Sequence, residues 1–513
     1  MEKTTQMPNT AAFDVSKYLE EQTSAILERA ARFENKLYLE FGGKLIFDYH
    51  ASRVLPGFDP NVKMQLLQKL KDKTDIILCI YAGDIERRKT RADFGITYDA
   101  DALKLIDDLR RDWGLQITAV VVTRFEDQPS SKLFMNKLER RGIRVYTHRA
   151  TKGYPTDVDL IVSDEGYGAN PRIETTHPLV VVTGPGPNSG KLGTCLSQLY
   201  HEHKRGIHAG YAKFETFPIW NLPLKHPVNV AYEAATADLK DVNLIDPFHL
   251  EAYGETAINY NRDVEAFPVL RRILERITGT APMYRSPTDM GVNRAGFAIV
   301  DDAAARRAAG HEVIRRYLRY SCEYMMGLVD KETVQRAELI MKELGARVED
   351  RPVVGPARAA AEEARQNTSK GHNGIYCGAA IELSDGTVVT GKNSPLMHSA
   401  AAAVLNAIKH LAELPDKLHL ISPSILQSIS DLKMDIHGGQ SVSLDLEEAL
   451  IALSTSTTAN SAAYLAAKKL KNLRGCEMHM THIPTPGDEA GLRTLGLNLT
   501  SDPQFPSASL FMT

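Results

Sequence analysis

The sequence predicts an α/β protein with a doubly wound, mostly parallel sheet, followed by a helical subdomain and a smaller α/β domain. Apolar segments of strand length alternate with amphipathic helical segments in the first part of the chain, and helical periodicity dominates the middle part. Strand and helix patterns return near the C-terminus. A chain of 513 residues is too long for a single hydrophobic core, so we expect about three domains. Their expected bounds are 1–241, 242–365 and 366–513.

The first expected elements lead up to the sheet. Apolar residues recur at spacings of three and four over residues 13–35 and predict a helix. Residues 36–47 alternate in the manner of a hairpin that turns at Gly42 and Gly43. A second helix is expected over residues 60–72.

From residue 74 onward, apolar strands alternate with helices. The expected strands are 75–82, 116–123, 144–148, 158–163 and 179–182, and the expected helices are 99–113, 131–142 and one that begins at Lys191. This alternation is typical of a parallel sheet with helices on both faces. Ligands of such folds bind at the carboxyl ends of the strands, where Arg124 and Asp164 are expected to lie.

A loop rich in glycine and proline joins the strand 179–182 to the helix that begins at Lys191. Such a junction directs several backbone N–H groups and the positive end of the helix dipole toward one point, where an anion is stabilised. The residues expected to bind phosphate are Gly184, Gly186, Asn188, Ser189, Gly190, Lys191 and Thr194. The sequence therefore predicts a phosphate-binding loop.

This loop departs from the P-loop motif of nucleotide-binding proteins. Gly184 lies one residue too far from Gly190, and Leu192 replaces the hydroxyl that binds magnesium. A magnesium ion would then be held by Thr194 or Asp164 instead. The alternative is a glycine-rich turn that only connects a strand to a helix, but the polar donors of the loop favour anion binding.

The segment 206–241 is unusually rich in aromatic residues and prolines for a surface connector. It is typical of an ordered loop that lines a pocket. Lys213 and Glu215 lie among the aromatic residues, where burial would shift their pKa values. We expect them to act in acid-base catalysis or charge stabilisation, and the alternative is a structural ion pair.

Composition limits the partners and the compartment. The 61 basic and 64 acidic residues give a net charge of -3, so no global field attracts nucleic acid or an anionic membrane. The five cysteines form no C-x-x-C pair, and neither a leader segment nor an apolar run near 18 residues is present. These features predict a cytoplasmic protein without disulfides or a four-cysteine zinc site. The expected partners are a small-molecule or phosphorylated substrate and further copies of the chain.

The middle of the chain is predicted to be helical. Helical periodicity covers residues 267–278, 303–320, 321–328 and 331–344. Between the first two lies the polar, turn-rich segment 283–302, MYRSPTDMGVNRAGFAIVDD. It is expected either to act as a lid over a site or to be a connector stabilised by its own Ser and Asp turns.

The C-terminal domain is expected to begin with a hairpin and a helix. The expected elements are strands 375–383, 387–391 and 476–483 and helices 399–414, 444–471 and 487–495. This order, with the phrase DGTVVTGKNSPLMHSAAAAVLNAIKHLA, resembles the opening of the cytidine-deaminase-like fold. In that family a His or Cys followed by Ala-Glu begins the helix, and P-C-x-x-C completes a zinc site. Here Ser399 and Ala400 follow His398, so the resemblance implies a deaminase-like scaffold without deaminase chemistry.

Taken whole, the chain resembles a bacterial domain-of-unknown-function family of about this length. The phrases GPGPNSGK, GYAKFETFPIWNLPLKHPVNVAYEAATADL and SPTDMGVN carry the resemblance, which covers essentially the full chain. Some members of that family have been labelled ATP-dependent metalloproteases. The sequence argues against this label because it contains no H-E-x-x-H motif, which holds zinc and its catalytic base.

The leading hypothesis is an ATP- or GTP-dependent phosphotransferase or ligase that uses magnesium and acts on a small molecule. The loop would hold the phosphates, while Lys213 and Glu215 would orient or activate the acceptor. One alternative is a regulatory protein that binds a nucleotide or metabolite without turnover. Another is a metal-independent transferase that binds a phosphorylated substrate in the same loop.

Overall fold

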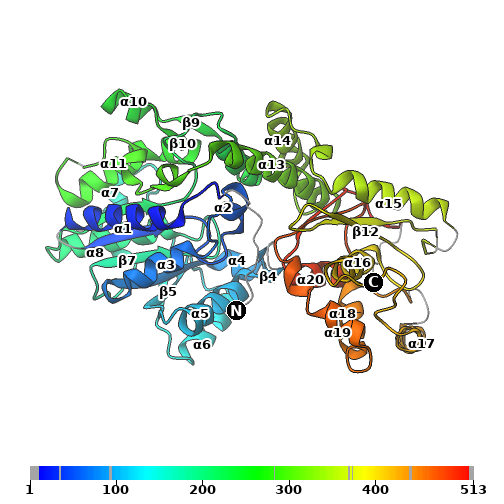
Figure 1. The fold of residues 1–513 in the computed structure, drawn as a ribbon. Coiled ribbons are helices and arrows are strands. Elements are labelled where there is room, and N and C mark those ends of the chain that lie inside the picture. Colours follow the sequence, from blue (N-terminus) through cyan, green and yellow to red (C-terminus); the bar gives the residue numbers. More distant parts are fainter. Residues whose placement is uncertain are drawn as a thin grey trace. The chain divides into compact units, whose positions relative to one another are not determined.

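The computed structural model describes residues 11–33, 36–91, 95–281, 283–367, 370–372, 374–437 and 442–507 (Figure 1). The chain divides between Ala309 and Gly310 into two compact units, called here the N-terminal and the C-terminal unit. The residues that follow position 242, as far as Ala309, belong to the same unit as the parallel sheet. The three domain bounds expected from the sequence stay a prediction.

A six-stranded sheet in the order β6-β5-β2-β7-β1-β8 forms the centre of the N-terminal unit (Figure 1). Its strands are β1 (Leu37–Phe41), β2 (Thr74–Tyr81), β5 (Ala119–Thr123), β6 (Val145–His148), β7 (Leu179–Thr183) and β8 (Gly210–Phe214). All neighbouring pairs are parallel. Every residue of β1, β5 and β7 is buried, as expected for a sheet covered on both faces. The α/β fold class with a parallel sheet is confirmed.

Helices cover the two faces of this sheet in turn. The main ones are α5 (Tyr98–Asp112), α6 (Pro129–Glu139), α8 (Lys191–Lys204) and α11 (Asn261–Thr278). Leu78 and Val120 face the core with α5 and α6, whereas Ile77 and Val182 face the core with α8 and α11. The chain therefore leaves β2 and β7, which are neighbours, toward opposite faces. Ligands of doubly wound sheets bind at such a switch point.

Three expectations for the sheet were wrong or incomplete. Residues 36–47 form no hairpin, because their first half is β1, which lies between β7 and β8. The apolar run 158–163 is not a strand but contains the short helix α7 (Val158–Ile161). Short apolar runs carry no period that separates a buried strand from a helix. Strand β8 was missed because its residues lie in the segment that was interpreted as a loop.

Smaller elements complete the N-terminal unit. They are α1 (Val15–Ala31), α2 (Tyr49–Val54), α3 (Val62–Lys69), α4 (Ala82–Glu86), β3 (Thr90–Arg91), β4 (Ile96–Thr97), α9 (Pro227–Ala235), β9 (Asn243–Ile245), α10 (Pro247–Tyr253), β10 (Ile258–Tyr260) and α12 (Pro287–Met290). The polar segment 283–302 follows the outer edge of β8. The amide of Val292 donates to the carbonyl of Lys213 at 2.9 Å, and Gly291 forms a parallel bridge with Lys213. This segment thus supplies hydrogen bonds to a strand edge that would otherwise be open.

The C-terminal unit is a smaller α/β structure with a mixed sheet in the order β12-β11-β13-β14. Its elements are α13 (Asp302–Met325), which begins before the division, α14 (Lys331–Glu343), α15 (Val354–Gln366), β11 (Gly378–Glu382), β12 (Val388–Lys392), α16 (Ser399–Leu411), α17 (Pro423–His437), α18 (Leu446–Ser456), α19 (Ser461–Ala467), β13 (Glu477–Met480), α20 (Pro486–Leu495) and β14 (Asn498–Ser501). The two helices expected over 303–328 are one helix, α13. The smaller C-terminal α/β region is confirmed, and the deaminase resemblance stays a prediction.

His398 precedes α16 and is engaged by a carboxylate. Its Nδ1 lies 2.7 Å from Oδ2 of Asp488. Burial opposes the charged imidazolium, but the hydrogen bond and the charge of Asp488 outweigh it and raise the pKa of His398 above its ordinary value. The histidine at the position of the expected scaffold pocket therefore forms an ion pair within the unit.

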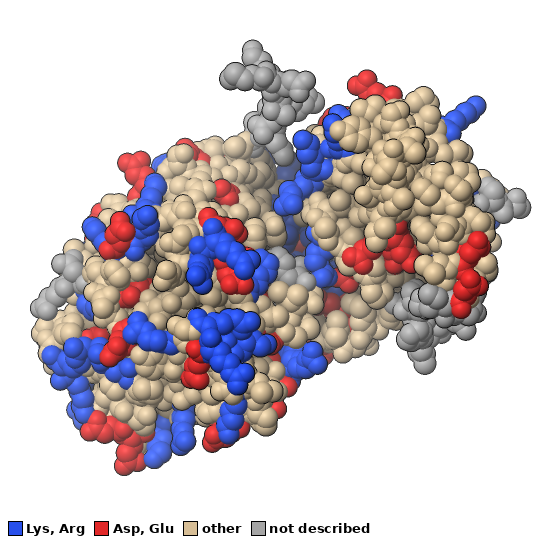
Figure 2. Space-filling model, turned by 90° about the horizontal axis from the view of Figure 1, so that it is seen from below, with Lys and Arg blue, Asp and Glu red and all other residues tan. Residues whose placement is uncertain are grey.

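Two surface properties bear on the expected partners. Basic and acidic side chains are interspersed on the face that Figure 2 shows. No helix within the described ranges combines the length and the apolar character needed to span a membrane. Attraction of an anion must therefore come from a local arrangement of donors, as the sequence predicts.

Candidate functional site

The glycine-rich loop turns sharply between β7 and α8. Asn188 and Gly190 adopt left-handed backbone conformations, with φ of 58° and 90°. A Cβ atom on Gly190 would lie 2.7 Å from the side chain of Thr123 at the end of β5. Glycine is therefore required at this position both by its dihedral angle and by the close approach of β5.

The peptide groups of this loop are oriented by contacts to their carbonyl oxygens. Thr123 Oγ1 donates to the carbonyl of Ser189 at 2.8 Å, and the Arg124 guanidinium donates to the carbonyl of Asn188. The first hydrogen bond of α8 runs from the Thr194 amide to the Gly190 carbonyl. Within the described part of the chain, no protein group accepts from the amides of residues 188–193. These donors remain available at the N-terminus of a 14-residue helix, which is the arrangement that binds phosphate.

Lys191 stays close to the loop. Its half-buried ammonium lies 3.4 Å from the carbonyl of Gly186 and 3.5 Å from Oγ of Ser189. A second cation, Arg124, holds its guanidinium over the ring of Tyr81, 3.4 Å from the ring centroid. The loop therefore combines free amides with two positive charges, all at the carboxyl edge of the sheet.

The two residues expected to hold magnesium are placed differently: Thr194 lies in the first turn of α8 beside the loop, whereas Asp164 lies at the other end of that helix. Thr194 is buried, and its Oγ1 contacts Sγ of Cys79 at 3.4 Å. The side chain of Asp164 is 80% exposed and pairs with Lys204 and Tyr200 near the end of α8. At 1.5 Å per residue, the end of α8 is roughly 20 Å from Lys191. Over the ranges that the structure describes, no group of three or more His, Cys, Asp or Glu side chains is arranged to hold a metal ion.

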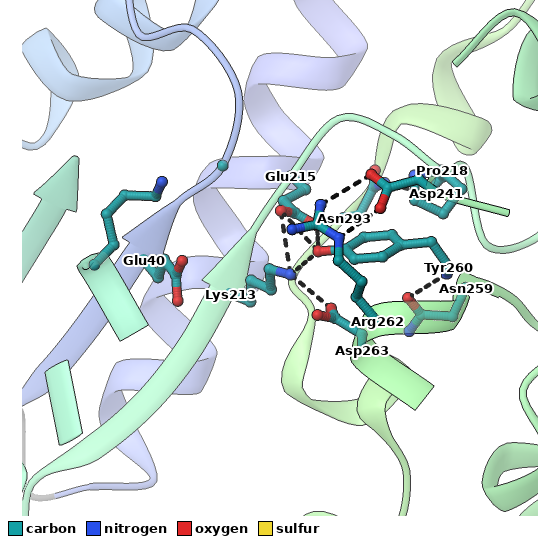
Figure 3. A network of polar contacts seen from close by, with 12 residues as sticks. Glu40, Lys213, Glu215, Pro218, Asp241, Asn259, Tyr260, Arg262, Asp263 and Asn293 are labelled. Carbon is teal, nitrogen blue, oxygen red and sulfur yellow. Dashed lines mark hydrogen bonds and ion pairs between the residues drawn. The ribbon is translucent and has the colours of Figure 1, made fainter. Parts of the chain in front are cut away.

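The other two expected catalytic residues come together at the end of β8. Nζ of Lys213 lies 2.6 Å from Oδ2 of Asp263 and 3.2 Å from Oε1 of Glu215. The ammonium also donates to the hydroxyl of Tyr260, which lies 3.2 Å from both oxygens of Glu215. Figure 3 shows these four side chains converging from β8, the residue after β8, β10 and α11. We call them the Lys213 cluster.

Burial and mutual charge set the protonation of this cluster. Burial opposes the charge of Lys213, but the carboxylates of Asp263 and Glu215 outweigh it and raise the lysine pKa, so the ammonium persists. Burial raises the pKa of Glu215 to about 7, against the attraction of Lys213 and with a contribution from the neighbouring acids Asp263 and Glu40. The glutamate can therefore gain and lose a proton near neutral pH, which is what a general base requires.

The backbone that follows β1 confines Glu215. A Cβ atom on Gly42 would lie 2.2 Å from Cγ of Glu215, so only glycine leaves room for this side chain. Arg262, whose guanidinium lies 5.3 Å from the centroid of the Tyr260 ring, forms an ion pair with buried Asp241 (Figure 3). Glu215 therefore lies between the backbone turn at Gly42 and the hydroxyl of Tyr260, and the neighbouring Arg262 is held by its ion pair with Asp241.

The glycine-rich loop and the Lys213 cluster share one edge of the sheet. Strand β1 lies between β7 and β8, and neighbouring strands are 4.7–4.9 Å apart, so the two groups arise from strands about 10 Å apart. Gly42 follows β1 between them. The structure therefore places the loop with Lys191 and the pair Lys213 and Glu215 at one sheet edge, but not Asp164.

Sequence reasoning missed Tyr260 and Asp263. They lie 47 and 50 residues after Lys213, in a stretch that was interpreted only as helical. One feature of the sequence could have indicated them. Tyr260 directly precedes the helix α11, whose first turn contains the charged residues Arg262 and Asp263, and the buried apolar face of this helix begins only at Phe267.

The fold and this site define an α/β protein with a glycine-rich loop, followed by a helix, at the carboxyl edge of a parallel sheet. Residues 11–345 match the family model described as domain of unknown function DUF1846, N-terminal, and residues 349–511 match the corresponding C-terminal model. The UPF0371 proteins of Clostridium tetani (strain Massachusetts / E88) and Clostridium botulinum (strain ATCC 19397 / Type A) are each 58% identical to this chain over 499 residues. Each alignment covers 97% of this chain and 99% of the relative. The chain belongs to the DUF1846 (UPF0371) family.

Proposed function

We propose that this protein is a phosphotransferase or ligase that binds the phosphates of ATP, GTP or a phosphorylated small molecule in the glycine-rich loop. The observation that carries the proposal is the row of free amides at residues 188–193, with Lys191 beside it. An anion placed there accepts several hydrogen bonds and meets the positive end of the α8 dipole. Arg124 adds a second positive charge at the edge of the loop.

The Lys213 cluster supplies the acid-base chemistry. An acceptor hydroxyl or amine beside Glu215 loses its proton to the carboxylate while its oxygen or nitrogen attacks the phosphorus. The bond from phosphorus to the leaving oxygen breaks, and that oxygen keeps the electron pair. Lys213 and Tyr260 hold the carboxylate in place through the contacts described above. Catalysis then rests on positioning and charge neutralisation.

A second candidate is a metal-independent transferase that binds a phosphorylated substrate in the same loop. The observation that favours it concerns the two expected magnesium ligands: Asp164 lies at the far end of α8, and Oγ1 of the buried Thr194 contacts Sγ of Cys79. In that case Lys191 and Arg124 neutralise the phosphate charge. Thermal-shift titrations with ATP, GTP and pyrophosphate, each with and without magnesium, separate the two candidates.

Lys191→Ala tests the loop directly. We expect affinity for the best of these ligands to fall about 10- to 100-fold, since a hydrogen bond from a charged donor contributes roughly 1.5–3 kcal/mol. Lys204→Ala is the matched control, because Lys204 lies on the same helix but pairs with Asp164 at its far end. Equal affinities of the two variants would contradict the proposal.

Glu215→Gln separates an enzyme from a regulatory protein. With the raised pKa of Glu215, to about 7, single-turnover rates should increase as the pH rises through that value, because the base form becomes populated. The glutamine variant should bind the ligand normally and lose this increase. If both proteins bind ligand and neither transforms it with any acceptor, the regulatory alternative is the correct one.

A further inference from the structure

A cavity of about 280 Å³ lies in the N-terminal unit, and neither the glycine-rich loop nor the Lys213 cluster lines it. Its walls come from α1, α10, the aromatic segment after β8 and the SPTDMGVN segment. The side chains that give it its chemistry are Arg29, Arg32, Arg294, His249, Trp220 and Tyr253. We propose that this cavity binds a small metabolite in which a carboxylate or phosphate is joined to a flat ring.

Three arginines and two carboxylates, those of Glu28 and Asp289, line the cavity, which leaves one positive charge in excess. Arg29 donates only to neutral groups, the hydroxyl of Tyr284 at 3.2 Å and the carbonyls of Met290 and Gly291. Among the described residues, no carboxylate or other hydrogen-bond acceptor pairs with the guanidinium of Arg32 or Arg294. Free guanidinium groups that line one cavity are suited to a carboxylate or phosphate, which they bind in a bidentate manner.

The acidic residues of the cavity are already engaged. Asp289 accepts from the hydroxyl of Tyr253 at 2.8 Å and from the amides of Arg285 and Ser286. Glu28 accepts from Ser24 on the exposed side of α1. The three arginines exceed these two carboxylates by one charge, so an anion is favoured over a cation.

Aromatic groups and a histidine also line the cavity. Nδ1 of His249 contacts Oγ of buried Ser286 at 3.0 Å, which leaves Nε2 without a partner among the described residues. The imidazole lies 6.3 Å from the ring of Trp220 and 4.8 Å from the ring of Tyr253. The indole is oriented by a hydrogen bond from its Nε1 to the carbonyl of Asn293. A flat ring can stack on these groups while its anionic group reaches the arginines.

The cavity is held open by contacts to the sheet and to α1. The backbone amide of Val292 donates to the carbonyl of Lys213, and the side-chain Nδ2 of Asn293 donates to the carbonyl of Thr216 at 2.9 Å. Gln22 of α1 bonds to the carbonyl of Val292 and accepts from the amide of Arg294. Because hydrogen bonds hold this wall against both the sheet and α1, little conformational entropy is lost when a ligand binds. The volume lies near the lower limit for small-molecule pockets and suits one ring with one anionic group rather than a nucleoside triphosphate.

The test uses the tryptophans of the chain, which number two. Trp113→Phe leaves Trp220 as the only indole, so its fluorescence reports the cavity. Phenyl phosphate, benzoate, inorganic phosphate and benzyl alcohol are titrated at constant ionic strength up to about 10 mM. We expect a saturable change with phenyl phosphate or benzoate and a much weaker response to the other two. The stronger of the first two identifies the anionic group.

Arg32→Gln with Arg294→Gln should weaken that binding at least about tenfold in the Trp113→Phe protein. Neither guanidinium forms a hydrogen bond or ion pair with a residue that the structure describes, so the variant should fold normally, which its melting temperature checks. Arg271→Gln, at an exposed position of α11 outside the cavity, is the matched control. Lys191→Ala should also leave the Trp220 signal unchanged. No saturable response to either aromatic anion, an unaltered affinity in the double variant, or loss of the signal with Lys191→Ala would each overturn the proposal.

Discussion

Replacement of Lys213 by methionine tests whether the Lys213 cluster is held together by its one cation. The lysine side chain is 13% exposed and contacts two carboxylates that are themselves 20% and 22% exposed. Methionine preserves the length and apolar stem of the side chain but leaves Asp263 and Glu215 as neighbouring buried acids. One or both must then take up a proton or be hydrated, and either response costs free energy of folding.

The free energy of unfolding of the Lys213→Met variant should be lower by about 3–5 kcal/mol, which is the usual cost when one partner of a buried ion pair is removed. For a unit of this size that corresponds to a fall in melting temperature of roughly 6–10 °C, measured by differential scanning calorimetry at pH 8. At lower pH the deficit should shrink, because the orphaned carboxylates become protonated.

Lys152→Met is the matched control for this experiment. Lys152 belongs to the same unit and also pairs with a glutamate at 3.1 Å, but its side chain is 63% exposed. Exposed pairs contribute about 0–1 kcal/mol, so this variant should melt close to the wild type. The double variant Lys213→Met with Asp263→Asn should recover part of the loss, since one of the two orphaned charges is gone. The reasoning is refuted if Lys213→Met costs no more than Lys152→Met.

Three further predictions concern single residues. Gly190→Ala should lower the free energy of unfolding by about 1–3 kcal/mol, because φ at this position is 90° and the new Cβ would contact a threonine of β5. The variant should also bind pyrophosphate more weakly in the thermal-shift assay. His398→Gln should lower the melting temperature at pH 5.5 more than at pH 9. The bond to Asp488 raises the histidine pKa, so the ion pair stabilises the fold fully below about pH 6.5, and this stabilisation is lost as the pH rises through the raised pKa. Arg351→Met should change the free energy of unfolding in urea by less than about 1 kcal/mol. Two buried nitrogens of Arg351 have no hydrogen-bond partner among the described residues, and Glu477, which pairs with Arg351, keeps its ion pair with a second arginine. A loss near 3 kcal/mol in that variant would show that the buried pair itself is stabilising.

The parts of the site that lie within one short stretch could be predicted from the sequence. The loop around Gly190 needs glycine for its backbone angle and a helix that begins directly afterwards, and both requirements are visible in consecutive residues. Lys213 and Glu215 were found because a charged pair among aromatic residues is unusual in a connector. Their partner Asp263 could not be found in this way, because it lies 50 residues further along the chain.

By itself, the sequence determined the fold class, the alternation of strands and helices, and the position of the glycine-rich loop before α8. The tertiary structure alone decided that β1 lies between β7 and β8, with Leu37 beside both Leu179 and Gly210. That choice places β8, which leads to Glu215, about two strand spacings from β7, which leads to the loop. The tertiary structure also places Asp164 at the far end of α8. The physical reason is that backbone angles and helix starts depend on neighbouring residues. The order of strands, in contrast, depends on which apolar faces bury one another across more than a hundred residues of chain.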